Sequence, residues 1–147
     1  MNIREAQLED VETLFHIRTS VIENYQSREE LATLGITPKA IATMLQSDFR
    51  AWIAEIDGQP IGFSMANAVQ KNIYGMFVLP AFESRGVGSA LMQQAEEWLY
   101  SQEIEEIWLL TANEPKLRAY KFYLHLNWTP AEVQANGKIK FIKKRPD

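Results

Sequence analysis

The chain has 147 residues, of which 46% are apolar and 23% are charged, and these values fit one globular domain spanning residues 1–147. It contains no cysteine, which excludes disulfides, cysteine-ligated zinc and a thiol nucleophile, and its two histidines, His16 and His125, form no metal-ligand pattern, so we expect no metal. The net charge of −4 argues against nucleic acid as a partner, because phosphate-backbone binding requires a basic surface. We find neither a membrane-span-length apolar run nor a signal-peptide pattern, and therefore expect a cytoplasmic protein with no membrane partner.

The first third of the chain predicts one strand and three helical stretches. Ile3 to Ala6 reads as a short strand, and residues 8–23 carry apolar side chains at helical spacing. A second helical stretch follows and is broken at Gly35. Thr37 and Pro38 then supply a cap and a first-turn proline for a helix that runs to about residue 46.

The middle of the chain changes to the period of strands. The segments 49–56 and 60–68 flank Asp57-Gly58, a strong two-residue turn signal, and together predict a hairpin. Residues 72–78 predict a third strand. It should end at Pro80, which has no N–H to donate to a sheet.

The last third predicts a helix over 86–101, a buried strand over 106–112 and a helix from Pro115 to about residue 126. Segments 129–135 and 138–144 around the turn Asn136-Gly137 predict a second hairpin. This order of elements predicts an α/β (α+β) fold, with a mixed sheet and helices on both faces.

Basic residues concentrate in the last ten positions of the chain. Two interpretations are open: an anion-facing patch, or a solvated edge strand whose lysines prevent aggregation at the sheet edge. We favour the edge strand. The residues concerned are Lys138, Lys140, Lys143, Lys144 and Arg145.

The segment from Val78 to Leu91 is the most informative part of the sequence. A strand ends there, and a helix begins at two glycines, Gly86 and Gly88. Backbone N–H groups at a helix start are unpaired, and glycines lack Cβ atoms, so a phosphate can approach the main chain closely. Taken alone, the glycines can equally serve only the turn. Leu91 stands where a dinucleotide-binding motif has its third glycine, and no Lys-Ser/Thr pair completes a P-loop.

Val-x-Pro followed by Arg-Gly-x-Gly and Ala-Leu-Met resembles the acyl-CoA motif of the GNAT acetyltransferase superfamily. The family pattern is Gln/Arg-x-x-Gly-x-Gly/Ala, and here it reads Glu-Ser-Arg-Gly-Val-Gly, with Glu83 in place of Gln or Arg. The resemblance extends over nearly the whole chain, from the opening strand and helix through the 49–68 hairpin to Ala119-x-x-Phe-Tyr-x-x-Leu-Asn-Trp. It implies a mostly antiparallel central sheet of about seven strands flanked by about four helices.

The resemblance also implies an acetyl-CoA-dependent N-acetyltransferase, with acetyl-CoA as co-substrate and a primary amine as acceptor. In the family, main-chain groups of the strand before the proline contact the pantetheine and the acetyl carbonyl, and main-chain N–H groups of the loop hold the phosphates. Carried over to this chain, the strand contacts fall on Met76, Phe77 and Val78. The loop contacts fall on Ser84, Arg85, Gly86, Val87, Gly88 and Ser89.

By the same resemblance, Tyr123 is the candidate catalytic acid that protonates the departing thiolate. Tyr120, three residues earlier on a similar helix face, is its competitor. Two positions depart from the family pattern in this segment. Lys116 stands where the family has an asparagine, and Asn127 replaces a glycine at the helix stop, a change that a left-handed conformation tolerates.

The sequence leaves the general base and the acceptor open. Glu23, Glu55 or a water chain are the alternatives for the base. The acceptor region is expected between residues 25 and 48 and in the last hairpin. There, Glu29 and Glu30 either attract a cationic amine or, as we favour, cap and solvate the second helix.

Three functional interpretations remain. The leading one is an active N-acetyltransferase. The second is a CoA-binding regulatory module without turnover, suggested by Glu83 and by the lack of an acidic residue on the 72–78 strand. The third is a domain for another nucleotide, disfavoured because no acidic ribose-binding residue follows in a βαβ frame. Relatives in the family are often dimers, so a homodimer stays an open alternative for this chain.

Overall fold

The computed structural model describes residues 1–147 and contains one seven-stranded sheet in the order β1-β2-β3-β4-β5-β7-β6. Every neighbouring pair of strands is antiparallel except β4 and β5, which run parallel. The predicted mixed, mostly antiparallel sheet is therefore confirmed. The strands are β1 (Asn2–Glu5), β2 (Phe49–Ile56), β3 (Gln59–Asn67), β4 (Asn72–Val78), β5 (Glu106–Ala112), β6 (Thr129–Val133) and β7 (Lys138–Lys144).

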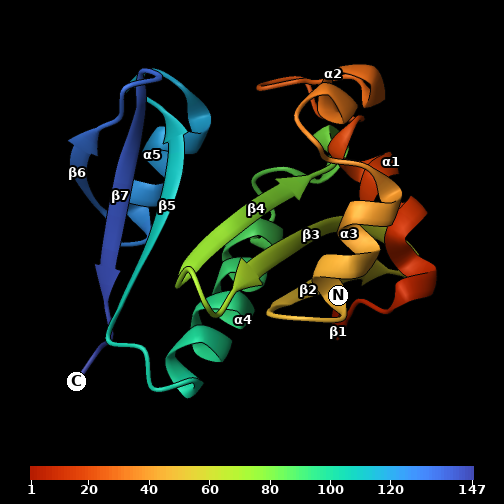
Figure 1. The fold of residues 1–147 in the computed structure, drawn as a ribbon, viewed down its shortest axis with the longest axis horizontal. Helices are drawn as coiled ribbons and strands as arrows, with labels where there is room; N and C mark the ends of the chain where they lie inside the picture. Colours follow the sequence, from red (N-terminus) through yellow and green to blue (C-terminus); the bar gives the residue numbers. More distant parts are fainter.

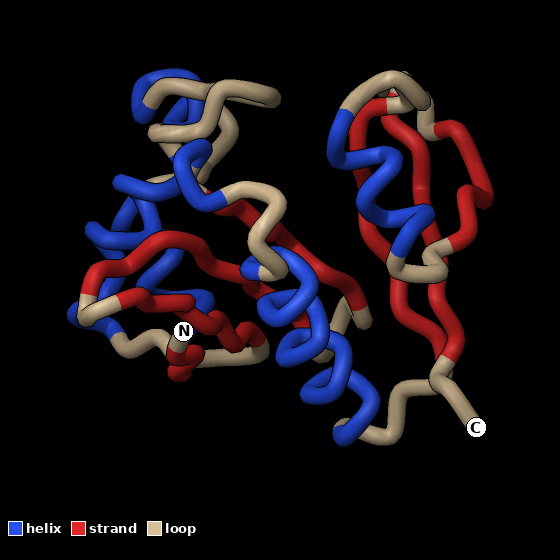
Figure 2. Tube along the Cα trace, turned by 180° about the vertical axis from the view of Figure 1, so that it is seen from behind, coloured by secondary structure: helices blue, strands red, loops and turns tan.

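Five α-helices cover the two faces of this sheet, as the helical segments of the sequence predict, where the family resemblance implied about four. They bury two apolar clusters, one between the sheet and α1 to α3 and the other between the sheet and α4 and α5. Figures 1 and 2 show α3 on one side of β2 and β3, and α4 on the opposite side. The helices are α1 (Val11–Arg18), α2 (Arg28–Thr33), α3 (Pro38–Leu45), α4 (Val87–Ser101) and α5 (Arg118–His125).

The sheet opens between its two central strands. The register pairs β4 with β5 only at Asn72 and Trp108, next to a hydrogen bond from the Trp108 amide to the Lys71 carbonyl at 3.2 Å. A bulge in β4 lies one step further along, where the pairing with β3 shifts and leaves Tyr74 without a partner residue. Beyond the bulge the two strands diverge, as Figure 1 shows, and the sheet consists of two half-sheets.

Two helices are shorter than predicted, and local hydrogen bonding explains both differences. Helix α1 ends at Arg18 rather than near residue 23. The Ser20 hydroxyl donates to the His16 carbonyl at 2.5 Å, the acceptor that the Ser20 amide would use in a continued helix, and that amide bonds to the Ile17 carbonyl at 3.1 Å instead. Helix α5 begins at Arg118 rather than at Pro115. Residues 114–117 instead form a turn closed by the Leu117 amide on the Glu114 carbonyl at 3.0 Å.

The edge-strand interpretation of the lysine-rich segment is wrong. Strand β7 lies between β5 and β6, and β6 forms the edge of the sheet. Two of the four lysines of β7 have specific partners: Lys140 lies over the Trp108 ring at 5.1 Å, and the Lys143 ammonium is 2.7 Å from the Glu96 carboxylate. These two lysines are three residues apart and so lie on opposite faces of the sheet, and each face supplies a partner.

Glu96 links the two half-sheets, β1 to β4 and β5 to β7, because α4 packs on the first and the partners of Glu96 belong to the second. Its carboxylate pairs with Lys143 on β7 and accepts a hydrogen bond from the Trp128 indole N–H at 3.2 Å. Glu96 is 8% exposed and Trp128 is 2% exposed, so both interactions are shielded from water. The pairing ties α4 to the start of β6 and to β7.

Replacing Glu96 by alanine is expected to lower the free energy of unfolding by about 2–3 kcal/mol, because it leaves a partly buried ammonium and an indole N–H without partners. Denaturant unfolding measures this change. Glu97→Ala is the matched control, since Glu97 is exposed one position along the same helix and should change stability by less than about 0.5 kcal/mol. Equal effects of the two substitutions would contradict the assignment.

Candidate active site

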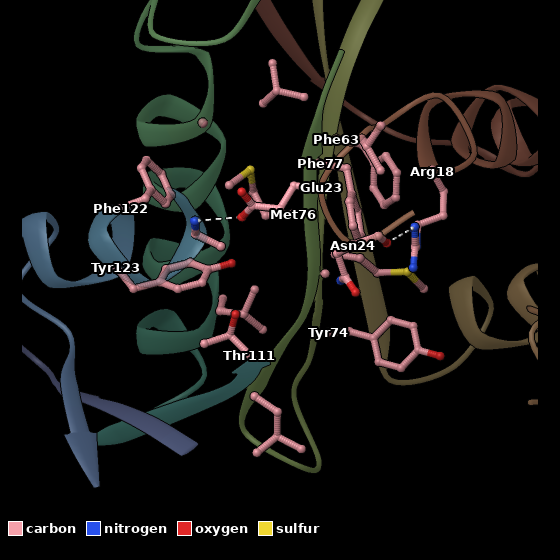
Figure 3. A pocket seen from close by; sticks show the side chains of 18 of the residues that line it. Arg18, Glu23, Asn24, Phe63, Tyr74, Met76, Phe77, Thr111, Phe122 and Tyr123 are labelled. Carbon is pink, nitrogen blue, oxygen red and sulfur yellow. Dashed lines mark hydrogen bonds between the residues drawn. The ribbon is translucent and has the colours of Figure 1, made fainter. Parts of the chain in front are cut away.

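A cleft of about 790 Å³ opens where β4 and β5 diverge. Figure 3 shows β4 passing through it, with Tyr123 and Met76 on one side of the strand and Arg18 and Phe77 on the other. We call the side lined by Gly86, Gly88, Ser89, Phe122 and Tyr123 the α4 arm, and the side lined by Phe15, Arg18, Leu31, Phe63 and Phe77 the α1 arm. The two arms meet at β4.

The N-terminus of α4 forms the end of the α4 arm. Gly86 is its N-cap, with φ +79° in the left-handed region, and the Ala90 amide donates to the Gly86 carbonyl at 3.1 Å. The amides of residues 87–89 precede the first intrahelical hydrogen bond and have no partner in the helix. No acidic side chain lies in the first turn to offset the positive end of the helix dipole, and Gly86, Gly88 and Ser89 at this end line the cleft.

The two loop glycines have different structural roles. A Cβ atom at Gly86 would meet nothing within 4 Å, so this position opens onto free space. A Cβ atom at Gly88 would lie 3.1 Å from the Phe122 ring and 3.4 Å from the Met76 methyl group. Gly88 therefore allows α5 to pack closely against the start of α4, while Gly86 supplies the turn.

Arg118 offsets the unusual acidic residue of the loop. Its Nε atom lies 3.4 Å from the Glu83 carboxylate, and its Nη2 atom donates to the Ser84 hydroxyl at 2.7 Å. Arg85 points elsewhere, over the Phe82 ring at 5.5 Å. The sequence did not indicate Arg118, because its contact with the loop is between residues more than 30 positions apart.

The main chain of β4 is open to the cleft on the side of β5. Residues of an antiparallel pair alternate between hydrogen-bonded and non-bonded positions, and the Leu79 amide bonds to the Ile61 carbonyl at 2.8 Å. Phe77 lies two residues before Leu79, so its main-chain N–H and C=O groups also point toward β3. Its carbonyl oxygen would lie 2.9 Å from a Cβ atom placed on Gly62 of β3, which agrees with this direction. Met76 and Val78 direct their N–H and C=O groups away from β3, toward the open edge.

Tyr123 projects from α5 into the α4 arm, and its hydroxyl points toward β4 in Figure 3. The ring packs against Phe122, Trp128 and Phe141 at centroid distances of 5.4, 6.4 and 6.0 Å. The hydroxyl forms no hydrogen bond within the chain, and burial of the 8% exposed residue raises its pKa to about 12. Its competitor Tyr120 packs on the Phe141 ring at 5.0 Å and does not line the cleft.

Of the two carboxylates considered as a base, only Glu23 reaches the cleft. Its oxygens accept hydrogen bonds from the amides of Arg118 and Ala119 at 3.3 and 3.2 Å. The Glu23 side chain therefore connects the segment after α1 to the first turn of α5 (Figure 3). Glu55 instead pairs with Arg4 at 3.3 Å, outside the cleft.

The two acidic residues considered for attracting the amine, Glu29 and Glu30, lie at the start of α2 and do not line the cleft. Glu30 completes a capping box with Ser27, which agrees with the capping role that we favoured. Lys116 is exposed and also lies outside the cleft lining. Asn72, where β4 and β5 meet, has a buried Oδ1 atom without a hydrogen-bond partner, a feature that no sequence pattern indicated.

The fold is shared with enzymes that bind coenzyme A. The structure of PaiA N-acetyltransferase from Thermoplasma acidophilum in complex with coenzyme A superposes with a TM-score of 0.83, at 19% identity over 99% of this chain and 100% of that one. An aminoglycoside 6′-N-acetyltransferase complexed with coenzyme A superposes with a TM-score of 0.75, at 18% identity and full coverage of both chains. No helix is long and apolar enough to cross a membrane.

Sequence comparison gives the family. An uncharacterized N-acetyltransferase from Archaeoglobus fulgidus is 28% identical over 93% of this chain and 99% of its own length. The family model described as "Acetyltransferase (GNAT) family" matches residues 11–128, which is most of the chain. The protein is therefore an acyltransferase that belongs to the acetyltransferase (GNAT) family.

Proposed function

We propose that this enzyme transfers an acetyl group from acetyl-CoA directly to a primary amine, with both substrates bound at once. The observation that carries the proposal is the arrangement of the cleft: an unpaired helix start, an open strand edge and the Tyr123 hydroxyl all line it. The two arms meet at β4, which leaves room for one substrate on each side of the strand. A ternary complex needs this geometry.

The α4 arm provides the groups that acetyl-CoA requires. The amides of residues 87–89 and the positive end of α4 receive the pyrophosphate, with Gly86 allowing close approach. Met76 and Val78 offer main-chain N–H and C=O groups to the pantetheine amides, as an added strand would. Acetyl-CoA, when bound, supplies the acetyl group as a thioester.

Tyr123 acts at the thioester sulfur. The amine nitrogen attacks the acetyl carbon, the carbon–sulfur bond breaks, and the amine loses one proton while the sulfur gains one. A hydroxyl with a pKa of about 12 is protonated at neutral pH and is available to donate a hydrogen bond to the sulfur as negative charge develops there. If Tyr123 gives up its proton, it regains one from the attacking nitrogen, so the overall proton balance closes.

The pH dependence of kcat/KM should report the acceptor rather than the enzyme. No histidine lines the cleft, so no enzyme group there has an ordinary pKa near neutrality. We expect log kcat/KM to rise with a slope near one up to the pKa of the acceptor amine. It should show no fall until the pH nears the pKa of Tyr123, about 12, because that hydroxyl stays protonated below it. Profiles for two acceptors with different amine pKa values measure this. A break that does not move with the acceptor would contradict it.

Calorimetry with acetyl-CoA, followed by thiol release with a panel of primary amines, tests the proposed function. Tight binding and thiol release with some amine are expected. Tight binding without release on any amine would favour a CoA-binding module without turnover. Absence of binding would overturn the proposal.

A further inference from the structure

Arg18 stands apart from most arginines of the chain because no carboxylate pairs with it. Five of the seven arginines form ion pairs within 4.0 Å, and they are Arg4, Arg28, Arg50, Arg118 and Arg145. The two others are Arg85, in the loop before α4, and Arg18, inside the α1 arm. An arginine is rarely buried without an anion, so the unpaired guanidinium of Arg18 needs an explanation.

The surroundings of Arg18 hold its guanidinium in place without neutralising it. It lies over the Phe77 ring at 4.4 Å, donates from Nη2 to the Gln26 side-chain oxygen at 2.7 Å and from Nη1 to the Asn24 carbonyl at 3.2 Å (Figure 3). A guanidinium has five N–H donors, so three remain without a protein partner. Burial of this half-buried side chain lowers its pKa, the expected effect where no anion compensates for lost hydration.

No other group in the cleft takes the place of a counter-ion for Arg18. Only two carboxylates line the cleft, Glu23 and Glu83. The oxygens of Glu23 accept the amides of α5, and Glu83 pairs with Arg118. The rest of the α1 arm around the guanidinium is apolar, including Phe15, Leu31 and Phe63.

We propose that Arg18 binds the carboxylate of the acceptor, so that the preferred substrates are amino acids with an apolar portion, acetylated on their amine. The inference rests on the proposed function, since it assigns the α1 arm to the acceptor. A single guanidinium fork matches the charge and geometry of one carboxylate. The apolar walls receive the rest of the substrate, and the amine points to β4, where the two arms meet.

Matched pairs of acceptors test the inference on the intact enzyme. Phenylalanine against phenylalaninamide, and ε-aminocaproate against hexylamine, compare amines that differ in the carboxylate, placed near the amine or far from it. For each acceptor, kcat/KM is taken on its plateau above the pKa of the amine, so that differences in amine basicity do not enter the comparison. We expect kcat/KM for the acid to exceed that of its neutral partner by at least about tenfold in one pair. The pair that shows the preference tells how far the reacting amine lies from the carboxylate.

The variant Arg18→Gln is expected to raise KM for the preferred acid by about ten- to hundredfold, with kcat changed far less and KM for the neutral partner changed by less than about threefold. Arg18→Lys, which keeps the charge but not the fork, should recover part of the loss. Arg50→Gln is the matched control. It removes the same charge from an arginine that lies over the Trp98 ring, pairs with Glu5 and lies outside the cleft lining.

The outcomes separate this inference from the proposed function. If the wild-type enzyme acetylates acids and their neutral partners equally well, acetyl transfer stands and the role of Arg18 is overturned. Equal losses for both members of a pair in Arg18→Gln also overturn it, because they indicate a structural role. If acetyl-CoA binds but no amine of either kind releases thiol, the proposed function fails and the inference falls with it. The wild-type comparison decides the matter even if the variant does not fold.

Discussion

Replacing Gly86 by glutamate is expected to weaken acetyl-CoA binding at least about hundredfold. The new side chain would project into open space at the N-terminus of α4, where a carboxylate competes with and repels the pyrophosphate. A residue with a Cβ atom also strains the left-handed conformation at φ +79° by about 1–2 kcal/mol. Calorimetric titration with acetyl-CoA measures the loss directly.

Gly58→Glu separates the effect of position from that of backbone strain. Gly58 has φ +78° and nothing within 4 Å of its Cβ position, which matches Gly86, but it lies in the turn between β2 and β3, outside the cleft lining. It should lose similar stability and retain the affinity for acetyl-CoA. Unchanged affinity in Gly86→Glu, or an equal loss in both variants, would show that the α4 N-terminus is not the phosphate site.

Tyr123→Phe is expected to lower kcat by about 10²-fold or more, with the Kd for acetyl-CoA changed by less than about threefold. The hydroxyl forms no hydrogen bond within the chain, so its removal breaks none, and the ring packing on Phe122, Trp128 and Phe141 is retained. The loss therefore reports chemistry rather than folding. Steady-state thiol release and calorimetry on the same preparation provide the two numbers.

Tyr120→Phe is the matched control for this prediction. Tyr120 lies one turn earlier on α5 and packs on the same Phe141 ring, but it does not line the cleft. Its removal should leave kcat within about twofold. If the two variants retain the same turnover as the wild-type enzyme, Tyr123 is not the acid, and the proton reaches the sulfur from solvent.

Local signals predicted the strands well. The bounds of β2, β4, β5 and β7 agree with the sequence prediction, because apolar runs there end at strong turn or breaker residues such as Asp57-Gly58 and Pro80. Helix ends were less predictable. At the end of α1 the Ser20 hydroxyl occupies the carbonyl that the next helical amide would use, and helical periodicity does not report such a contact.

The site was predictable only where it is local in sequence. The loop around Gly86 is contiguous, so its glycine turn at a helix start could be predicted, and the structure shows this turn lining the cleft. Arg18, Arg118 and the contact of Glu23 with α5 depend on elements brought together from distant parts of the chain, and no pattern along the sequence indicated them. The place of β7 inside the sheet was missed for the same reason, since strand order is a property of the whole fold.

The single point of pairing between β4 and β5 has a consequence for how this enzyme responds to its own substrate. A ligand lying along the open edge of β4 would supply main-chain contacts along a strand edge that pairs with β5 at only one position. Its binding energy then adds to the stability of the folded chain, as RT ln(1 + [L]/Kd). The melting temperature should therefore rise with acetyl-CoA concentration, and the protein should be most stable when this co-substrate is bound.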